Sequence, residues 1–290
     1  MKMLRKSLAL ILALCLCCGL AVSASASTFT DAHGNTVELD DSLEAWSGAV
    51  LSGADDAARK GETNLGDLWT DALRWFAVSG AINDYFEEDD VTAGNTRVDA
   101  EADQIVALWN GGNLRADVAE GKFGAEQLAE VLPYPNKVAV VYMTGAQLLE
   151  ALEAASQALP YTEDTAAACA SFMQVSGLRY TVDTSKEFAR GEAYDEKGNW
   201  FRAASLGRVT VEDVNGHPFD EAAVYAVITS NANFNGMDSS YMFRAAAEEN
   251  EKSTITTAVV RDVVWMYIAG ELNNQIGEAY AQAQGRITVK

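Results

Sequence analysis

The chain has 290 residues, of which 49% are hydrophobic, so it has enough apolar content for a packed core and is not an intrinsically disordered chain. Acidic residues outnumber basic ones by 42 to 21, giving a formal net charge of −21. A surface this acidic argues against nucleic acid and anionic membranes as partners, and any anion-binding pocket must be built locally against the overall field.

The first 26 residues have the pattern of a secretory signal peptide. A basic start with Lys2, Arg5 and Lys6 precedes an apolar run over residues 7–20, and small residues form the cleavage site. The run is too short for a membrane anchor, and no later run is long enough to span a bilayer. We therefore predict a secreted protein, located outside the cell or in the cell envelope.

Residues 27–61 are predicted to form an N-terminal hairpin, with its turn at Gly34-Asn35, and a connector with one helical stretch. From Glu62 onward, apolar residues recur at helical spacing, and Thr63 or Asn64 is placed to cap this helix. An acidic loop follows at 87–90, which we interpret as solvated.

The rest of the chain mixes predicted strands and helices. In order, we expect a strand at 104–109, a helix at 123–132, a strand at 138–143 and a helix capped by Thr144. A turn and strand at 172–183, an irregular insertion at 187–207 and a hairpin around Asn215-Gly216 follow. The chain ends with a buried strand at 224–229, a polar loop at 230–240 and a long final helix that begins at Thr254 or Thr256. Because strict βαβ alternation is missing, residues 62–290 are predicted to form one α+β (mixed α/β) domain, a mixed β-sheet flanked by helices.

The strongest functional signal directly follows the strand at 104–109. Asn110-Gly111-Gly112 breaks the strand, and Arg115 comes shortly after. The glycine pair permits φ > 0 and close approach of another group, and exposed N–H groups in such a turn can bind an anion. Arg115 adds a planar fork of donors that suits phosphate or carboxylate. On spacing alone, a tight surface turn with a solvated arginine explains the same residues.

Five segments carry a resemblance to a known family. They read ETNLGDLWTDALR (62–74), WNGGNLRADV (109–118), LAEVLPYPNKVAVVYMTGAQLLEAL (128–152), FMQVSGLRYTVD (172–183) and VYAVITSNANFNGMDSSYMF (224–243). In this order they resemble the C-terminal domain of the secreted 5′-nucleotidases, a family that includes UDP-sugar hydrolases and 2′,3′-cyclic phosphodiesterases. The resemblance implies a domain that binds the nucleoside or nucleotide, while a separate N-terminal metallophosphatase domain cleaves the phosphate.

The resemblance also implies site residues. The motif with Asn110, Gly111, Gly112 and Arg115 contacts substrate in that family. The family places another arginine just before the first helix, where this chain has Gly61. Either Arg59 or Lys60 slightly earlier replaces it, or the contact is lost.

Two aromatic rings sandwich the base in that family, and Phe172 matches one of them. The other follows a GGDG motif, which here reads Gly236-Met237-Asp238-Ser239-Ser240-Tyr241, so that Tyr241 arrives one place late. We expect Tyr241 to stack and Asp238 to contact substrate. In isolation, Phe172 fits a core residue, Tyr241 a half-buried surface aromatic and Asp238 a turn residue.

Metal-ligating motifs are not evident in the sequence. A two-metal phosphatase needs spaced clusters of His and Asp, and this chain has two histidines, His33 and His217. Asp31-Ala32-His33 is similar to a metallophosphatase opening, but no GDxxD, GNHD or GNHE follows, and a hairpin turn explains His33 better. Cys169, the one cysteine after the signal peptide, is interpreted as a small hydrophobe. We predict no catalytic residues, metal ligands or cofactor in this chain.

Three hypotheses follow. The chain is a secreted nucleotidase-like module that binds a nucleoside or nucleotide without hydrolysing it. Alternatively, it is the substrate-binding component of a 5′-nucleotidase, and a separate metallophosphatase chain supplies the divalent metals. The third hypothesis is a remnant that binds no nucleotide and serves in surface interactions.

Overall fold

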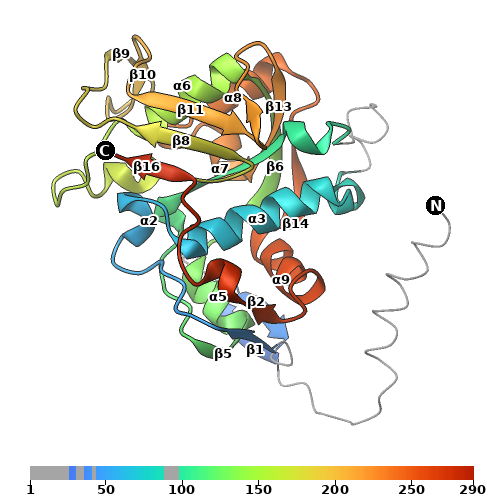
Figure 1. The fold of residues 1–290 in the computed structure, drawn as a ribbon. Helices are drawn as coiled ribbons and strands as arrows, with labels where there is room; N and C mark the ends of the chain where they lie inside the picture. The colour runs from blue at the N-terminus through green and yellow to red at the C-terminus, as the bar shows by residue number, and fades with distance from the viewer. Residues whose placement is uncertain (1–25, 31–35, 41–43, 88–97) are drawn as a thin grey trace, which may run out of the picture.

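The computed structural model describes residues 26–30, 36–40, 44–87 and 98–290 (Figure 1). The predicted signal peptide up to residue 25, the hairpin turn with His33, and most of the acidic loop that begins at Glu87 lie outside the described residues.

A five-stranded mixed sheet forms the centre of the molecule. Its strands, in spatial order, are β14 (Thr254–Val259), β6 (Lys137–Thr144), β13 (Val224–Ser230), β4 (Ile105–Asn110) and β7 (Met173–Ser176). Strands β13 and β4 run parallel, and the other neighbouring pairs run antiparallel. The predicted mixed sheet flanked by helices is confirmed.

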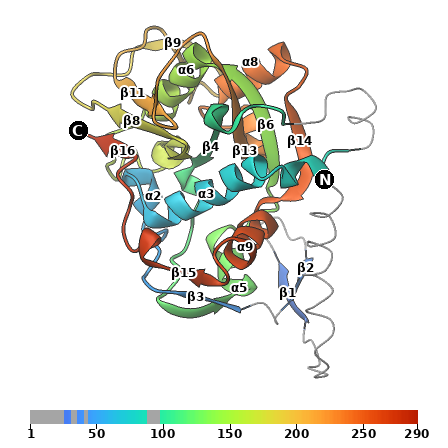
Figure 2. The same cartoon turned by 45° about the vertical axis from the view of Figure 1, so that its right-hand side comes forward.

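The two faces of this sheet contribute to two hydrophobic cores. Along β4, Ile105, Ala107 and Trp109 enter one core, whereas Val106 and Leu108 enter the other, as the period of two in a strand requires. Helices α3 (Asn64–Val78) and α9 (Val260–Gly270) cover the first face, and helices α6 (Gly145–Ala155) and α8 (Tyr241–Glu249) lie against the second (Figures 1 and 2). A strand buried on both faces explains why β4 is apolar throughout.

Helix α3 begins as the sequence predicts. The Thr63 side chain accepts a hydrogen bond from the Gly66 N–H at 3.0 Å, which satisfies one of the free donors of the first turn. Leu65, Leu68 and Trp69 are fully buried against the sheet. Capping and one continuous apolar face therefore define this helix.

Smaller sheets complete the fold. One has the order β12 (His217–Pro218), β11 (Val209–Val214), β8 (Leu178–Val182) and β16 (Ile287–Val289), and another has the order β15 (Gln275–Ile276), β3 (Glu44–Ser47) and β5 (Gly121–Gly124). Two further pairs are β1 (Ala26–Thr30) with β2 (Thr36–Asp40) and β9 (Arg190–Ala193) with β10 (Phe201–Ala203). The first pair confirms the predicted N-terminal hairpin, while β3 is a strand that the connector was not expected to contain.

Several predicted segments fold differently. The helix predicted at 123–132 begins only at α5 (Ala125–Val131), after β5, and the polar loop predicted at 230–240 contains α7 (Asn231–Phe234). Residues 254–259, expected to open the final helix, form β14, because their alternating β-branched side chains pair with β6 and the helix begins only at Val260. Residues 187–207, expected to be irregular, contain the β9–β10 hairpin. Its turn is fixed by Asp195, whose Oδ1 accepts the N–H groups of Asn199 and Trp200, both at 2.8 Å.

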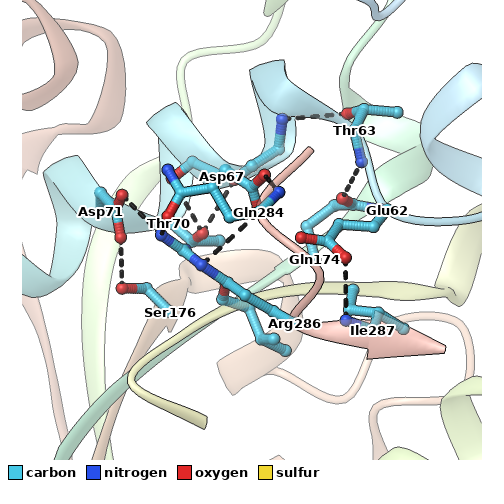
Figure 3. Close-up of polar contacts among 12 residues, drawn as sticks. Glu62, Thr63, Asp67, Thr70, Asp71, Gln174, Ser176, Gln284, Arg286 and Ile287 are labelled. Carbon is cyan, nitrogen blue, oxygen red and sulfur yellow. Dashed lines mark hydrogen bonds and ion pairs between the residues drawn. The ribbon is translucent and has the colours of Figure 1, made fainter. Parts of the chain in front are cut away.

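A polar network ties the C-terminal segment to α3 (Figure 3). Arg286 donates to Asp71 Oδ2 at 2.7 Å and to the Val175 carbonyl at 2.8 Å. The Gln284 N–H donates to Asp67 Oδ2 at 3.0 Å, and the Ile287 N–H donates to Glu62 Oε2 at 2.9 Å. The C-terminal segment that contains β16 is thus anchored to helix α3 and to Glu62, which directly precedes the N-cap of that helix.

Candidate binding site

The glycine pair after β4 is the point where three segments meet. Gly111 and Gly112 lie in a short 3-10 helix, η3 (Gly111–Asn113), between α2 (Ala57–Lys60) and a second 3-10 helix, η4 (Ala168–Ser171). A Cβ on Gly111 would lie 1.9 Å from the Ala58 carbonyl oxygen, and one on Gly112 would lie 2.4 Å from the Ala170 Cβ. Close packing therefore explains both glycines.

The exposed turn with positive φ expected at these glycines is wrong, while their contact with substrate stays a prediction. Neither Gly111 nor Gly112 adopts a left-handed φ, and both are buried. The Gly111 N–H already donates to the Phe172 carbonyl at 2.7 Å. The glycines allow close contact of η3 with α2 and η4.

Gln174 holds α2 in place, a role that was not predicted. This fully buried side chain on β7 donates to the carbonyls of Ala58 at 2.9 Å and Gly61 at 2.8 Å, and it accepts the Thr63 N–H at 3.1 Å. Every polar atom of the carboxamide is engaged with the backbone around α2. The glutamine of FMQVSG was the available signal, but its partners lie more than 100 residues away.

The charges of two arginines act on the pKa of one aspartate. Arg59 comes from α2, Arg115 follows η3, and Asp238 lies in the loop between α7 (Asn231–Phe234) and α8. Burial raises the pKa of the half-buried Asp238 carboxyl, and the positive charges of Arg59 and Arg115 both oppose that rise. The field of each guanidinium thus reaches the same carboxyl group, although the three residues are far apart in sequence.

The two arginines are held differently. Arg59 donates through Nη1 to the Ala166 carbonyl at 2.7 Å and its Nε lies 3.0 Å from Asp56 Oδ1, leaving its side chain 11% exposed. The Arg115 side chain is exposed, with its guanidinium carbon 5.8 Å from the centre of the Tyr134 ring. Arg59 is therefore preorganised, whereas Arg115 is accessible at the rim.

Lys60 points away from this cluster. Its ammonium donates to the Asp55 carbonyl at 2.6 Å and lies 4.9 Å from the centre of the Tyr161 ring. The half-buried Tyr161 in turn donates to Asp56 Oδ2 at 2.8 Å. Of the two predicted substitutes for the family arginine, Arg59 is the one whose charge acts on Asp238.

Asn110, at the end of β4, is 6% exposed, and its Oδ1 accepts a hydrogen bond from Asn113 Nδ2 at 3.0 Å. In the register of β4 and β7 it lies opposite Met173. The structure thus places Asn110 beside the segment that begins with Phe172.

The two predicted stacking aromatics are core residues in this structure. Phe172 and Tyr241 are each 1% exposed and belong to the core on the α6 and α8 side of the sheet. The Phe172 ring centre lies 6.3 Å from that of Tyr180. Tyr241 is therefore not the half-buried surface aromatic that this residue in isolation suggested. Neither ring exposes a face to solvent, and stacking of a base between them stays a prediction.

Comparison with known proteins decides the family. The sequence profile of the 5′-nucleotidase C-terminal domain matches residues 45–247. The chain belongs to the 5′-nucleotidase C-terminal domain family. The resemblance inferred from the five segments is confirmed.

The relatives of this family member are larger proteins. It is 30% identical over 193 residues to the cell wall protein Lmo0130 of Listeria monocytogenes, covering 64% of this chain and 19% of that protein. It is 29% identical over 132 residues to the trifunctional nucleotide phosphoesterase protein YfkN of Bacillus subtilis, covering 46% of this chain and 7% of that protein. The chain therefore spans less than a fifth of either curated relative.

A solved structure supports the fold. The crystal structure of the 5′-nucleotidase precursor from Thermus thermophilus superposes with a TM-score of 0.58 at 26% identity, over 85% of this chain and 39% of that one. The mixed α/β architecture is thus that of the C-terminal part of a 5′-nucleotidase.

Possible metal ligands are scattered in this family member. Among the residues that the structure describes, no three or more His, Cys, Asp or Glu side chains are grouped as metal ligands. Cys169 is buried, and the exposed His217 has its Nε2 4.0 Å from Asp103 Oδ2. Within the same described ranges, no helix has the length and apolar character needed to cross a bilayer.

Proposed function

We propose that this chain binds a nucleotide or nucleoside at the Arg59, Arg115 and Asp238 cluster, in the service of nucleotide catabolism, and is not hydrolytic by itself. The observation that carries the proposal is that the preorganised Arg59 and the exposed Arg115, which closely follows the family's NGG motif, both oppose the burial-driven rise in the pKa of the half-buried Asp238 carboxyl. In a chain of net charge −21, the exposed Arg115 offers a cation to an anionic ligand, while Arg59 is already paired with Asp56.

The chemistry of the cluster favours a phosphorylated ligand. Arginine forms paired hydrogen bonds with phosphate oxygens, and the exposed Arg115 is free to reach a ligand from the rim. The Asp238 carboxylate and the Asn110 carboxamide suit ribose hydroxyl groups, because each can accept a hydroxyl hydrogen bond. We therefore expect AMP to bind more tightly than adenosine.

A second candidate function is that of a substrate-binding component. The relatives named as a nucleotide phosphoesterase and a 5′-nucleotidase are much longer than this chain, which covers 39% of the solved Thermus nucleotidase. In this proposal a separate metallophosphatase chain docks beside the cluster and brings the divalent metals. The expected location is outside the cell or in the envelope, supported by the cell wall protein among the relatives.

Calorimetry with AMP, adenosine and UDP-glucose tests the binding function. Arg115→Ala is expected to weaken AMP by about tenfold to a hundredfold, the worth of a charge-assisted contact, and adenosine much less. Arg179→Ala is the matched control, because Arg179 is an exposed arginine paired with Asp213 on another sheet. Failure of all three ligands to bind at millimolar concentration would leave the interaction remnant as the better hypothesis. Equal loss of AMP and adenosine in Arg115→Ala would remove the phosphate role.

The component hypothesis needs a different measurement. Phosphate release from AMP with added Mn²⁺ or Zn²⁺ is followed for the chain alone and then with a candidate metallophosphatase. We expect release only in the second case. Release by the chain alone would contradict the non-hydrolytic proposal, and no gain over the partner alone would contradict the component role.

A further inference from the structure

We propose that the β9–β10 hairpin is a brace that fixes the loop carrying Asp238, with Tyr194 as its positioning residue. The Asp238 loop is defined here as residues 235–240, between α7 and α8. The inference rests on the proposed function, since Asp238 belongs to the proposed binding cluster, and it gives a role to the insertion at 187–207.

The hairpin holds its own shape before it contacts the loop. Its strands pair antiparallel, and the Tyr194 N–H donates to the Trp200 carbonyl at 2.8 Å next to the Asp195 turn. The Arg190 guanidinium lies 4.8 Å from the Phe201 ring centre across the two strands. A hairpin tied internally in these ways can act as a rigid support.

The hairpin contacts Tyr241, the residue that directly follows the Asp238 loop. The Tyr194 and Tyr241 ring centres are 5.3 Å apart, and the Arg202 guanidinium lies 5.2 Å from the Tyr241 ring centre. The Ala203 N–H donates to the Tyr241 hydroxyl at 3.0 Å, and that hydroxyl donates to Glu150 Oε1 on α6 at 2.6 Å. Tyr241 is therefore clamped between the hairpin and α6, which Figure 1 shows at the same end of the molecule.

Tyr194 also contacts the start of the Asp238 loop. Gly236 adopts φ +76°, and a Cβ at that position would lie 1.9 Å from the Tyr194 hydroxyl oxygen. The hydroxyl thus rests directly against the Gly236 backbone. Tyr194 contacts both ends of a short segment, Gly236 at one end and Tyr241 at the other.

Asp238 lies between the two residues that Tyr194 contacts, and its backbone conformation needs stabilising contacts. It adopts φ +52°, a left-handed conformation that costs a non-glycine residue free energy unless the surroundings hold it. Within the loop, the Met237 N–H donates to the Ala232 carbonyl at 3.1 Å and the Ser240 N–H donates to the Met237 carbonyl at 3.0 Å. The brace adds the external contacts that hold the Asp238 carboxyl where the charges of Arg59 and Arg115 act on it.

The test uses the full chain and four variants. Tyr194→Ala removes the ring and hydroxyl, Tyr194→Phe keeps the ring, and Arg202→Ala removes the guanidinium. Lys197→Ala is the matched control, because Lys197 is an exposed residue of the same hairpin turn. Hydrogen exchange of the peptide covering residues 234–243 reports the loop without ligand, and calorimetry with AMP from pH 5 to pH 8 reports the site.

We expect Tyr194→Ala to raise deuterium uptake at the Met237 and Ser240 amides and to weaken AMP by about tenfold, because a displaced Asp238 misaligns the ligand contacts. The pH dependence of AMP binding should shift with it, which a purely structural role would not produce. Tyr194→Phe keeps the ring contact with Tyr241 but loses the hydroxyl that contacts Gly236, so it should lie between Tyr194→Ala and the unaltered chain, as should Arg202→Ala. Lys197→Ala should match the unaltered chain.

Unchanged uptake in both Tyr194→Ala and Arg202→Ala would overturn the brace. Increased uptake with unchanged AMP affinity and pH profile would overturn the positioning role. Failure of the unaltered chain to bind AMP would instead count against the proposed function, and the exchange measurement would still decide whether the hairpin holds the loop.

Discussion

Arg286 and Asp71 form a short ion pair, with Nη2 and Oδ2 2.7 Å apart, between the C-terminal segment and helix α3 (Figure 3). The Asp71 carboxylate also accepts the hydroxyl groups of Ser176 at 2.5 Å and Tyr280 at 2.9 Å. The pair is largely shielded, with side-chain exposures of 13% and 19%. One carboxylate thus joins α3, β7 and the C-terminal segment.

Arg286→Ala is expected to lower the free energy of unfolding by about 3 kcal/mol, because it leaves Asp71 shielded and without its cation. The measurement is urea-induced unfolding, with the change read from the midpoint at constant slope. Arg179→Ala is the control, since its ion pair with Asp213 is more exposed and is expected to be worth less than about 1 kcal/mol. Similar losses in the two variants would contradict the anchoring role of Arg286.

Asp67 is a buried carboxyl group of α3, and Arg286 Nε lies 3.7 Å from its Oδ1. Among the described residues, neither Asp67 Oδ1 nor Glu62 Oε1 has a hydrogen-bond partner. Burial raises the pKa of Asp67 to about 7, the Arg286 charge opposes the rise, and the Glu62 charge adds to it. Asp67 therefore favours its protonated form more strongly in the native state than in the unfolded chain.

This raised pKa predicts a pH dependence of stability. Because the native pKa of Asp67 lies above its unfolded value of 3.8, the native state binds the extra proton between these values. The contribution is fully present below the unfolded pKa and is lost as pH rises through about 7. Urea unfolding at pH 5 and pH 8 should therefore show a smaller drop in Asp67→Asn than in the unaltered chain. Asp164→Asn, at an exposed loop position, is the control, and an equal drop in all three chains would contradict the raised pKa of Asp67.

The fold was largely accessible from sequence because its signals are local. The helix α3 carries a cap and a continuous apolar face, and β4 is an unbroken apolar run ending at Asn110. The error at Thr254–Val259 arose where a strand joins a helix directly, since Val259 offers no side-chain cap to mark the boundary.

The site was only partly accessible, because its determinants act across the sequence. Arg59, Arg115 and Asp238 were identified through the resemblance, and the structure brings their charges together. For the glycine pair the sequence left two reasons open, a turn with positive φ and close approach of another group, and the structure shows the second. Burial of Phe172 and Tyr241 could not be read from a linear motif either, because it depends on the packing of a core assembled from many segments.

Gly111→Ala tests the close contact. The added Cβ would meet the Ala58 carbonyl at 1.9 Å, so α2 must shift, and we expect a loss of about 1–3 kcal/mol together with weaker AMP binding. Gly61→Ala is the matched control, because a Cβ there meets nothing within 4 Å and its φ of −178° is accessible to alanine. Thermal and urea unfolding measure stability, and calorimetry measures AMP. A Gly111→Ala chain as stable as Gly61→Ala would show that η3 and α2 are not held at this distance.

Adjacent basic residues on α2 provide the sharpest test of the site. Arg59 is fixed by Ala166 and Asp56 and acts on Asp238, whereas Lys60 is turned toward Asp55 and Tyr161. Arg59→Ala should weaken AMP by about tenfold to a hundredfold, and Lys60→Ala should change it by less than about threefold, since only the first removes a preorganised charge. Arg59→Lys should restore little, because an ammonium cannot reproduce the planar fork that holds Ala166 and Asp56 together. If Lys60→Ala were the more damaging change, the anion would have to bind on the outer side of α2, away from Asp238.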